Sequence, residues 1–451
     1  MPFSRVIGTS ARTLKRRARR VSCAVAIGAL GLVVCTVGSR AVSAQRPGTT
    51  IQLTGSIGSA DSLVVSVLTM GQGQELFDRF GHIAIRVRNL RTGLDSAWNW
   101  GMYDFNSPNF VPRFLTGETR YWMAGYPSPL FVDYYRREGR AVWEQTLDLD
   151  RQEADSLLKV LRWQARDENK FYRYDYYLDN CSTRVRDAID AVLGGGLKRK
   201  LDGAGSGVTW RGETLRLAAE FPVIGLAMTF ALGPRADTPI SGWDELFVPM
   251  HVRDRIRAVR VARPLGERLL VLSEEALVPQ GPFREAAAPP SFLGWAGLLG
   301  LTLAALLRGI GAAAFNHKGA RIAFAIAGSG WHFVAGFAGS LVLWAGLFTR
   351  HVFMAANSSV LLGTPVSLAL AVMIPMALSR GATPRLRKAT MALSAFAAVA
   401  ALVALASHAF PSIAPRDVSP VLFAGPVHAV IALVMYRRFR EPAVREPAVS
   451  Q

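Results

Sequence analysis

Five apolar segments fill most of the last third of the chain, and they limit what the whole chain can become. Each is close to the ~20 residues that an α-helix needs to cross the hydrocarbon of a bilayer. They cover residues 291–308, 322–347, 358–379, 390–410 and 418–436. We therefore predict an all-α region of five transmembrane helices over residues 291–436.

The charges between these segments predict their orientation. Three stretches are basic, namely "RGIGAAAFNHKGAR", "RGATPRLRK" and the tail "RRFREPAVR", whereas the intervening turns carry only Arg350, and Arg416 beside Asp417. Cytoplasmic loops of membrane proteins carry the excess of Lys and Arg. This rule puts all three basic stretches in the cytoplasm, the third of them within the tail, residues 437–451. It puts residues 45–290 in the periplasm. We expect a multi-pass protein of a bacterial inner membrane.

The N-terminus leads to the same topology independently. A basic stretch, "RTLKRRARR", precedes an apolar run from Cys23 to Val37 and the sequence "AVSAQ". Val42 and Ala44 are small enough for the −3 and −1 positions of a signal-peptidase site. We predict a signal peptide over residues 1–44, with an uncleaved signal anchor as the alternative. The polar segment 45–62 is expected to be a flexible leader.

The net charge of +19 is typical of a nucleic-acid-binding protein, but its distribution argues against one. Residues 1–46 contain nine Lys or Arg and no acid, and residues 291–451 contain thirteen basic and three acidic residues. The region between them has 30 of each sign and is neutral. Because the excess flanks apolar segments rather than forming a basic face, we expect contact with membrane lipids, and with other membrane proteins, but not with nucleic acid.

Residues 63–263 have the pattern of a mixed α+β domain. Strand-like composition covers residues 63–70, 82–87 and 96–105. Amphipathic helices are predicted after Asp150 and from Cys181 to about Leu193. The apolar run 221–233 is too short to span a bilayer and is expected in the core. Residues 264–290 read as a linker.

Ionisable residues are nearly absent from the five spans. His332, His408 and His428 lie within them, scattered among Ala, Gly and Trp, and His351 lies at an end. We interpret the three as packing residues. A transporter is a weaker hypothesis, because the paired charges and the repeated broken helices of that class are not evident.

Cys181 is the single cysteine of the exported region, since Cys23 and Cys35 belong to the signal. It stands at a predicted helix start, where unpaired N–H groups lower a thiol pKa. His82 stands at a predicted strand start, and His251 is expected on the surface. A helix-start thiol beside a strand imidazole is the arrangement of a papain-type site, with Cys181 as nucleophile and His82 as general base. A buried, inert Cys181 is the alternative.

A third polar group should orient the imidazole. If the hairpin after His82 turns near Thr92–Gly93, His82 faces residues 101–104 of the next strand. Asp104 fits this register best, and Asn99 is the alternative. No Cys or His spacing indicates a zinc site, so we expect no metal or cofactor.

The runs "RFGHIAIRV", "WNWGMYDF", "YRYDYYLDNCSTRVRDAID" and "GPRADTPISGWDELFVPMHV" resemble the Lnb N-terminal periplasmic domain family over about residues 63–255. "DNCSTRVRD" is the most specific of these matches. The resemblance implies an α+β papain-like fold of the circularly permuted NlpC type, and it supports Cys181 as nucleophile and His82 as base. Arg184 and Asp187 are expected to form an ion pair along the helix.

These features together predict a membrane-anchored periplasmic thiol hydrolase or acyl or amide transferase. Its substrate would be an envelope component, such as a cell-wall peptide, a lipid or a lipoprotein. The main alternative is a non-catalytic envelope module that binds partners or assembles with other membrane proteins. A transporter with an accessory periplasmic domain is the weaker alternative.

Overall fold

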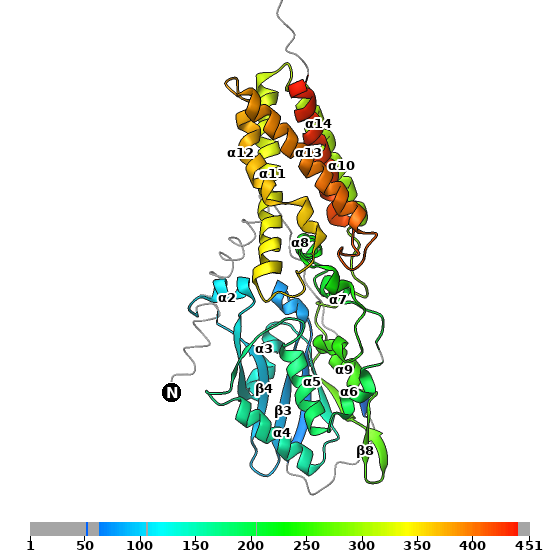
Figure 1. Cartoon of the computed structure of the whole chain (residues 1–451). Coiled ribbons are helices and arrows are strands. Elements are labelled where there is room, and N and C mark those ends of the chain that lie inside the picture. The colour runs from blue at the N-terminus through cyan, green and yellow to red at the C-terminus, as the bar shows by residue number, and fades with distance from the viewer. Residues whose placement is uncertain (1–50, 53–62, 105–106, 204, 441–451) are drawn as a thin grey trace, which may run out of the picture.

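The chain forms a sheet-containing unit beneath a bundle of long helices (Figure 1). The computed structural model describes residues 51–52, 63–104, 107–203 and 205–440. The predicted signal peptide and most of the tail lie outside the described residues, as does the leader apart from residues 51–52.

The lower unit is built on an eight-stranded antiparallel sheet of order β1-β10-β6-β2-β3-β4-β5-β7. Its strands are β1 (Ile51–Gln52), β2 (Leu63–Met70), β3 (His82–Asn89), β4 (Asp95–Met102), β5 (Arg120–Pro127), β6 (Val142–Leu147), β7 (Phe171–Arg173) and β10 (Val271–Val278). The strands predicted over residues 63–70, 82–87 and 96–105 are thus present as β2, β3 and β4. The central strands are β-branched and alternate between two buried faces, which is why composition alone identified them.

Helices cover both faces of this sheet. Val65, Val67, Ile83 and Ile85 point to one face, where they pack in a core with α4 (Arg151–Gln164), α5 (Cys181–Val192) and α9 (Pro249–Ile256). Met70, Ala84 and Val142 point to the other face and pack against α3 (Ser128–Arg137). Both predicted helices are therefore present. The α4 helix begins at a capping box of Asp150 and Glu153.

Shorter elements complete the unit. They are η1 (Leu76–Phe80), α2 (Phe110–Thr116), α6 (Gly196–Leu201), α7 (Trp210–Leu217), α8 (Pro222–Ala231), η2 (Pro234–Asp237), η3 (Asp244–Phe247), β8 (Arg260–Arg263) and β9 (Gly266–Leu269). Together with the sheet they give an α+β domain.

Two predictions within this unit are wrong. The segment predicted as a linker, 264–290, contains β9 and β10, and β10 pairs with both β1 and β6 inside the main sheet. The run 221–233 is core only at its end, where Leu232 packs in a buried cluster with Trp210 and Phe247. It forms α8, in which only Gly225 and Thr229 are buried, and it lies at the end of the unit nearest the bundle (Figure 1). Local composition could not identify either, because β10 carries three charged or polar residues and α8 is almost entirely apolar.

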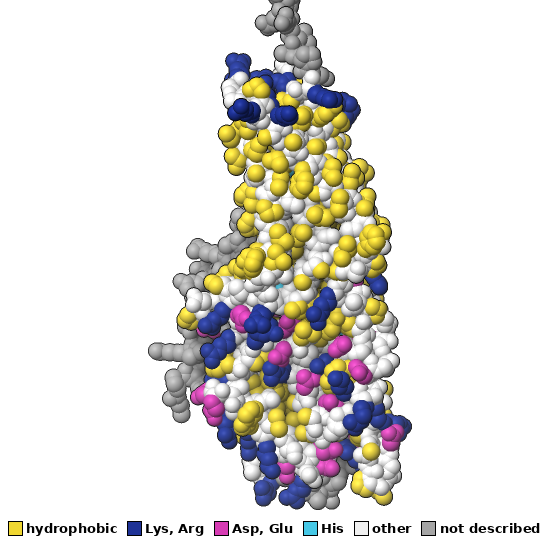
Figure 2. Space-filling model, viewed as in Figure 1, with side chains coloured by type: hydrophobic (Ala, Val, Ile, Leu, Met, Phe, Trp, Pro, Cys, Tyr) yellow, Lys and Arg dark blue, Asp and Glu magenta, His cyan; other side chains and the backbone are white. Residues whose placement is uncertain are grey.

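Five helices of the described chain are long and apolar enough to cross a membrane. They are α10 (Leu293–Ala313), α11 (Lys318–Phe348), the span Ser358–Leu378 formed by η4 (Ser358–Leu362) and α12 (Pro365–Leu378), α13 (Pro384–Ser407) and α14 (Ser419–Arg440). Figure 2 shows an apolar band over the bundle, with Lys and Arg gathered at the end remote from the sheet domain. The five predicted segments are confirmed.

The third span is interrupted between η4 and α12, at Gly363 and Thr364. His428 of α14 donates from Nε2 to the Leu362 carbonyl oxygen at this break, over 2.8 Å. The His332 and His428 rings lie 5.2 Å apart, so these two histidines meet rather than being scattered. One such break is present, and the other four described spans are each a single helix, so the repeated break expected of a transporter is not found among them.

The loop between α11 and η4 fastens the bundle to the sheet domain. The Arg350 N–H donates to the Thr116 carbonyl over 2.9 Å, and the Gly233 N–H donates to the Phe353 carbonyl over 2.6 Å. Asn357 Nδ2 donates to the carbonyls of Phe230 and Ala231. Phe353 itself packs on Tyr177, with ring centroids 4.3 Å apart. The two parts are therefore joined by polar and apolar contacts as well as by the chain.

We expect Gly339→Ala to destabilise the bundle by about 1–3 kcal/mol. A Cβ at Gly339 would lie 2.0 Å from the Gly363 carbonyl oxygen, so α11 or the break would have to move. Gly330→Ala on the same helix is the matched control, because a Cβ there has nothing within 4 Å. Thermal unfolding of both variants in one detergent measures the difference, and equal midpoints would contradict this packing.

Candidate functional site

Cys181 is the first residue of α5, and the residues around it in "DNCSTRVRD" fix this helix start. Asn180 is the N-cap, because its Oδ1 accepts from the Thr183 N–H over 2.9 Å while Thr183 Oγ1 accepts from the Asn180 N–H over 2.8 Å. Asn180 Nδ2 also donates to the Phe247 carbonyl over 2.9 Å. Ser182 Oγ donates to the Leu246 carbonyl over 2.7 Å. The helix start is therefore tied to the "DELF" segment more than 60 residues away.

The two arginines of the same motif bind groups outside α5. Arg184 binds both carboxylate oxygens of Asp179, at 2.5 and 2.7 Å, so the predicted Arg184–Asp187 pair is wrong. Asp187 instead accepts from Arg186 Nε over 2.8 Å. Arg186 Nη1 donates to the Trp243 carbonyl over 3.0 Å. Most polar side chains of the motif thus position Cys181.

His82 begins β3, and a bulge in the neighbouring strand makes room beside it. The β3–β4 register runs from Arg88↔Asp95 to Ala84↔Asn99, and the β4–β5 register shifts between Asn99 and Met102. Gly101 lies in this bulge with a φ of 91°, a conformation that favours glycine. A Cβ built on Gly101 would lie 3.7 Å from Cys181 Cβ and 3.7 Å from His82 Cε1. The thiol residue and the imidazole therefore flank one glycine backbone.

Asn99, rather than Asp104, lies against the imidazole. Asn99 Oδ1 and His82 Nε2 form a short hydrogen bond, and Asn99 is 2% exposed. Asp104 lies beyond Met102, the last residue of β4, and is exposed. The predicted register favoured Asp104, but pairing with β3 ends at Asn99. Since Asn99 Oδ1 can only accept, we assign the proton to Nε2, which leaves the Nδ1 lone pair free to take a proton.

Burial dominates the electrostatics of the thiol. Cys181 is 8% exposed. Burial raises the pKa of Cys181 to about 12, although backbone N–H groups of Ile83, Ser182 and Cys181 itself act in the opposite direction. The helix start does stabilise a thiolate, as predicted, but removal of the sulfur from water outweighs it. The expectation of a lowered thiol pKa is therefore wrong for this resting arrangement.

The imidazole is likewise kept neutral. Burial lowers the pKa of His82 to about 4, while the Asn99 hydrogen bond raises it and the Arg140 charge lowers it further. Above about pH 4 the pair is accordingly a neutral thiol beside a neutral imidazole. A general base of this kind takes the thiol proton only as the sulfur attacks, rather than holding a preformed ion pair.

Two of the residues near the pair carried no signal in the sequence. Arg140 is 4% exposed and is held by Asp78 Oδ1 at 2.6 Å and the Gly71 carbonyl at 3.0 Å. The Tyr135 ring stacks near His82, with centroids 6.3 Å apart. Burial raises the pKa values of Tyr172 and Tyr174. Both lie close enough to Cys181 that a negative charge on its sulfur would raise these pKa values further. The run "FYRYDYY" before Cys181 marked Tyr172 and Tyr174 as candidates to line a cleft, whereas Arg140 and Tyr135 come from α3 and the residues after it and could not be recognised from spacing.

Alkylation of Cys181 in the folded protein is expected to rise steeply with pH. With a pKa of about 12, the thiolate fraction near pH 7 is about one part in 10⁵ and grows about tenfold per pH unit. Iodoacetamide labelling at pH 7, 8 and 9, followed by mass spectrometry, measures this slope. A rate that stops rising below pH 9 would indicate a stabilised thiolate and contradict the argument from burial. Cys181 in urea-unfolded protein is the reference, with an ordinary pKa of about 8.5.

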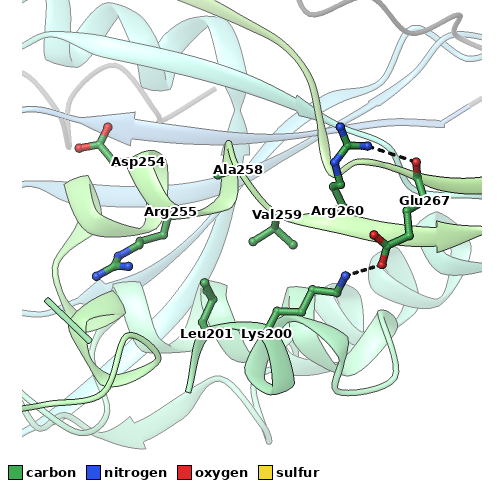
Figure 3. Close-up of a pocket in the computed structure, with 8 residues that line it drawn as sticks. All are labelled: Lys200, Leu201, Asp254, Arg255, Ala258, Val259, Arg260 and Glu267. Atoms are coloured by element: carbon green, nitrogen blue, oxygen red, sulfur yellow. Dashed lines mark hydrogen bonds and ion pairs between the residues drawn. The ribbon is translucent and has the colours of Figure 1, made fainter. Parts of the chain in front are cut away.

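A separate pocket is lined by none of the predicted site residues. Its volume is about 330 Å³, and it is lined by Lys200, Leu201, Asp254, Arg255, Ala258, Val259, Arg260 and Glu267. In Figure 3, Glu267 joins Lys200 and Arg260 across its rim. In the described part of the chain, no group of three or more His, Cys, Asp or Glu side chains is placed to hold a metal ion.

Part of the chain is similar to a known family. Residues 56–215 match the model of the Lnb N-terminal periplasmic domain family, a stretch that contains His82, Asn99 and Cys181. No curated protein and no solved structure matches the chain. The match and the five apolar helices fit a membrane-anchored envelope protein with a periplasmic domain.

Proposed function

We propose that this chain is a thiol hydrolase or acyl or amide transferase of papain-like fold that acts on an envelope component. The observation that carries the proposal is the meeting of Cys181 and His82 around Gly101, with Asn99 hydrogen-bonded to His82 Nε2. A nucleophile, a base and an orienting group are the three parts that covalent catalysis by a thiol requires.

The proposed chemistry uses the neutral pair. The Cys181 sulfur attacks the carbonyl carbon of an ester or amide, and the thiol proton passes to His82. The bond to the leaving group then breaks, and His82 returns the proton to that alcohol or amine. Water or an acceptor amine next attacks the thioester and gives its proton to His82; the carbon–sulfur bond then breaks, the acid or amide leaves, and His82 returns the proton to the Cys181 sulfur. Backbone N–H groups at the start of α5 are the donors nearest to the developing oxyanion.

The membrane region restricts where such a substrate is found. The basic residues gather at the end of the bundle remote from the sheet domain, which supports a cytoplasmic C-terminus under the positive-inside rule (Figure 2). The domain would then work in the periplasm next to the inner membrane. Cell-wall peptides, lipids and lipoproteins are all within reach of that position.

Acyl-enzyme trapping tests the proposal. The full chain in detergent is mixed with a p-nitrophenyl ester of a short fatty acid, and we expect a burst of p-nitrophenolate equal to the enzyme concentration. Peptide mapping should place the added acyl mass on Cys181. A chain that releases no burst, and whose Cys181 gains no acyl mass under these conditions, would favour the non-catalytic binding or assembly module.

A further inference from the structure

The short helix α2 (Phe110–Thr116) exposes its apolar side chains. None of its residues is buried, and Val111, Phe114 and Leu115 are 55%, 46% and 41% exposed. We call these three side chains the α2 surface. A soluble domain rarely leaves such a group of large apolar residues together in water, so this surface calls for a partner.

Contacts with the bundle fix the position of α2. α11 ends at Phe348, and the residues that follow it hold α2 directly. The Arg350 N–H donates to the Thr116 carbonyl over 2.9 Å, and His351 Nε2 donates to the Phe114 carbonyl over 3.1 Å. Arg350 also pairs with Glu118 at 3.0 Å. α2 therefore lies beside the end of α11 that faces the sheet domain (Figure 1).

The residues around α2 are those of a membrane interface. Leu347 and Phe348, at the end of α11, are 65% and 74% exposed, and the apolar surface of the span thus continues to α2. Arg113, within α2, is exposed, and the Arg350 side chain is 70% exposed. Arginines at a membrane interface reach lipid phosphates while their aliphatic stems lie on apolar surface.

We propose that the α2 surface docks into the outer leaflet of the inner membrane, as an interfacial element of the periplasmic domain. Its continuity with the apolar end of α11 and the flanking arginines both favour a lipid surface over a protein partner. The proposal does not depend on the thiol chemistry.

This contact is connected to the candidate site by a row of aromatic rings. Phe110 lies 6.4 Å from Tyr103, Tyr103 lies 5.1 Å from Tyr121, and Tyr121 lies 4.3 Å from Tyr174, measured between ring centroids. Tyr174 is one of the tyrosines whose pKa a Cys181 thiolate would help to raise. Docking of α2 would thus hold this wall of the site against the lipid surface.

Fluorescence quenching tests the docking. In the full chain with Cys23, Cys35 and Cys181 replaced by alanine, Phe114→Cys is labelled with bimane and reconstituted into vesicles of phosphatidylethanolamine and phosphatidylglycerol. Nitroxide-labelled lipids should lower the bimane emission at least ~twofold, as expected for a side chain at the headgroup boundary. Aqueous iodide should have little effect.

Leu265→Cys is the matched control, because Leu265 is an apolar side chain that is 100% exposed in the β8–β9 turn, far from the bundle. Its label should respond to iodide and not to nitroxide lipids. Val111→Cys provides a second position should Phe114→Cys fail to fold. If iodide quenched the bimane emission at Phe114→Cys as strongly as at Leu265→Cys, the proposal would be overturned. Protection from both quenchers would also overturn it, since a second copy of the chain would then cover α2.

Discussion

Cys181→Ala is expected to abolish acyl-enzyme formation while leaving the protein folded and inserted. The sulfur is the atom that forms the thioester, and no other cysteine lies in the part of the chain that the structure describes. The rate of p-nitrophenolate release should fall to the uncatalysed level, a loss of at least ~10³-fold. The burst and the acyl mass on the Cys181 peptide should both disappear. Stopped-flow absorbance and peptide mapping measure the two effects.

Folding of this variant has to be shown separately. Cys181 belongs to the main core, so removing its sulfur is expected to cost about 1 kcal/mol and to lower the unfolding midpoint only slightly. Cys181→Ser keeps more of the volume and should be equally inactive, because a buried hydroxyl is a poorer nucleophile. If either variant retained the full burst, the acylated residue would have to be another one and Cys181 would be a packing residue.

His82→Gln is expected to slow acylation by about 10²–10⁴-fold without removing it. The glutamine keeps a side chain of similar volume but cannot take the thiol proton. Because the pKa of His82 is lowered to about 4, the wild-type acylation rate should stay high down to about pH 4 and fall below it. The variant should lack that acid limb. Single-turnover rates from about pH 3 to about pH 8 cover this limb and distinguish loss of a base from loss of structure.

The same group predicts a pH effect on stability. The unfolded imidazole has a pKa of about 6.5, so it binds a proton between pH 6.5 and pH 4 where folded His82 does not. Stability is therefore lost as the pH falls through this window, by at most about 3 kcal/mol from this group. His82→Gln should lose less stability than the wild type between pH 7 and pH 4.5. Equal losses would show that His82 is not buried in neutral form.

Two further substitutions decide which residue orients the imidazole. Asn99→Ala removes the acceptor from His82 Nε2 and should slow acylation, though less than His82→Gln does. Asp104→Ala is the matched control, since Asp104 lies on the exposed end beyond β4 and should leave the rate unchanged. If Asp104→Ala slowed acylation and Asn99→Ala did not, Asp104 would be the residue that orients the imidazole.

Much of the architecture followed from local sequence signals. The five spans, the β2 to β4 strands and the α4 and α5 helices were predictable because each is encoded by composition and periodicity over a short window. The linker prediction failed for β10 because Ser273, Glu274 and Glu275 interrupt its apolar pattern. Glu274 is nevertheless buried, where Arg253 and Arg257 pair with it. Those partners lie on another element, so no local pattern could reveal them.

By itself, the sequence predicted five helices long and apolar enough to cross a membrane and a separate α+β domain, and it singled out Cys181 and His82. These conclusions depend on residue type and on order along the chain. Only the tertiary structure decided that Asn99 takes the place beside His82, because the bulge at Gly101 ends the strand pairing. Only the tertiary structure decided the protonation of the pair, because burial sums over many distant neighbours and outweighs the local field of the helix start. The meeting of His332 with His428 and the exposure of α2 depend on packing in the same way.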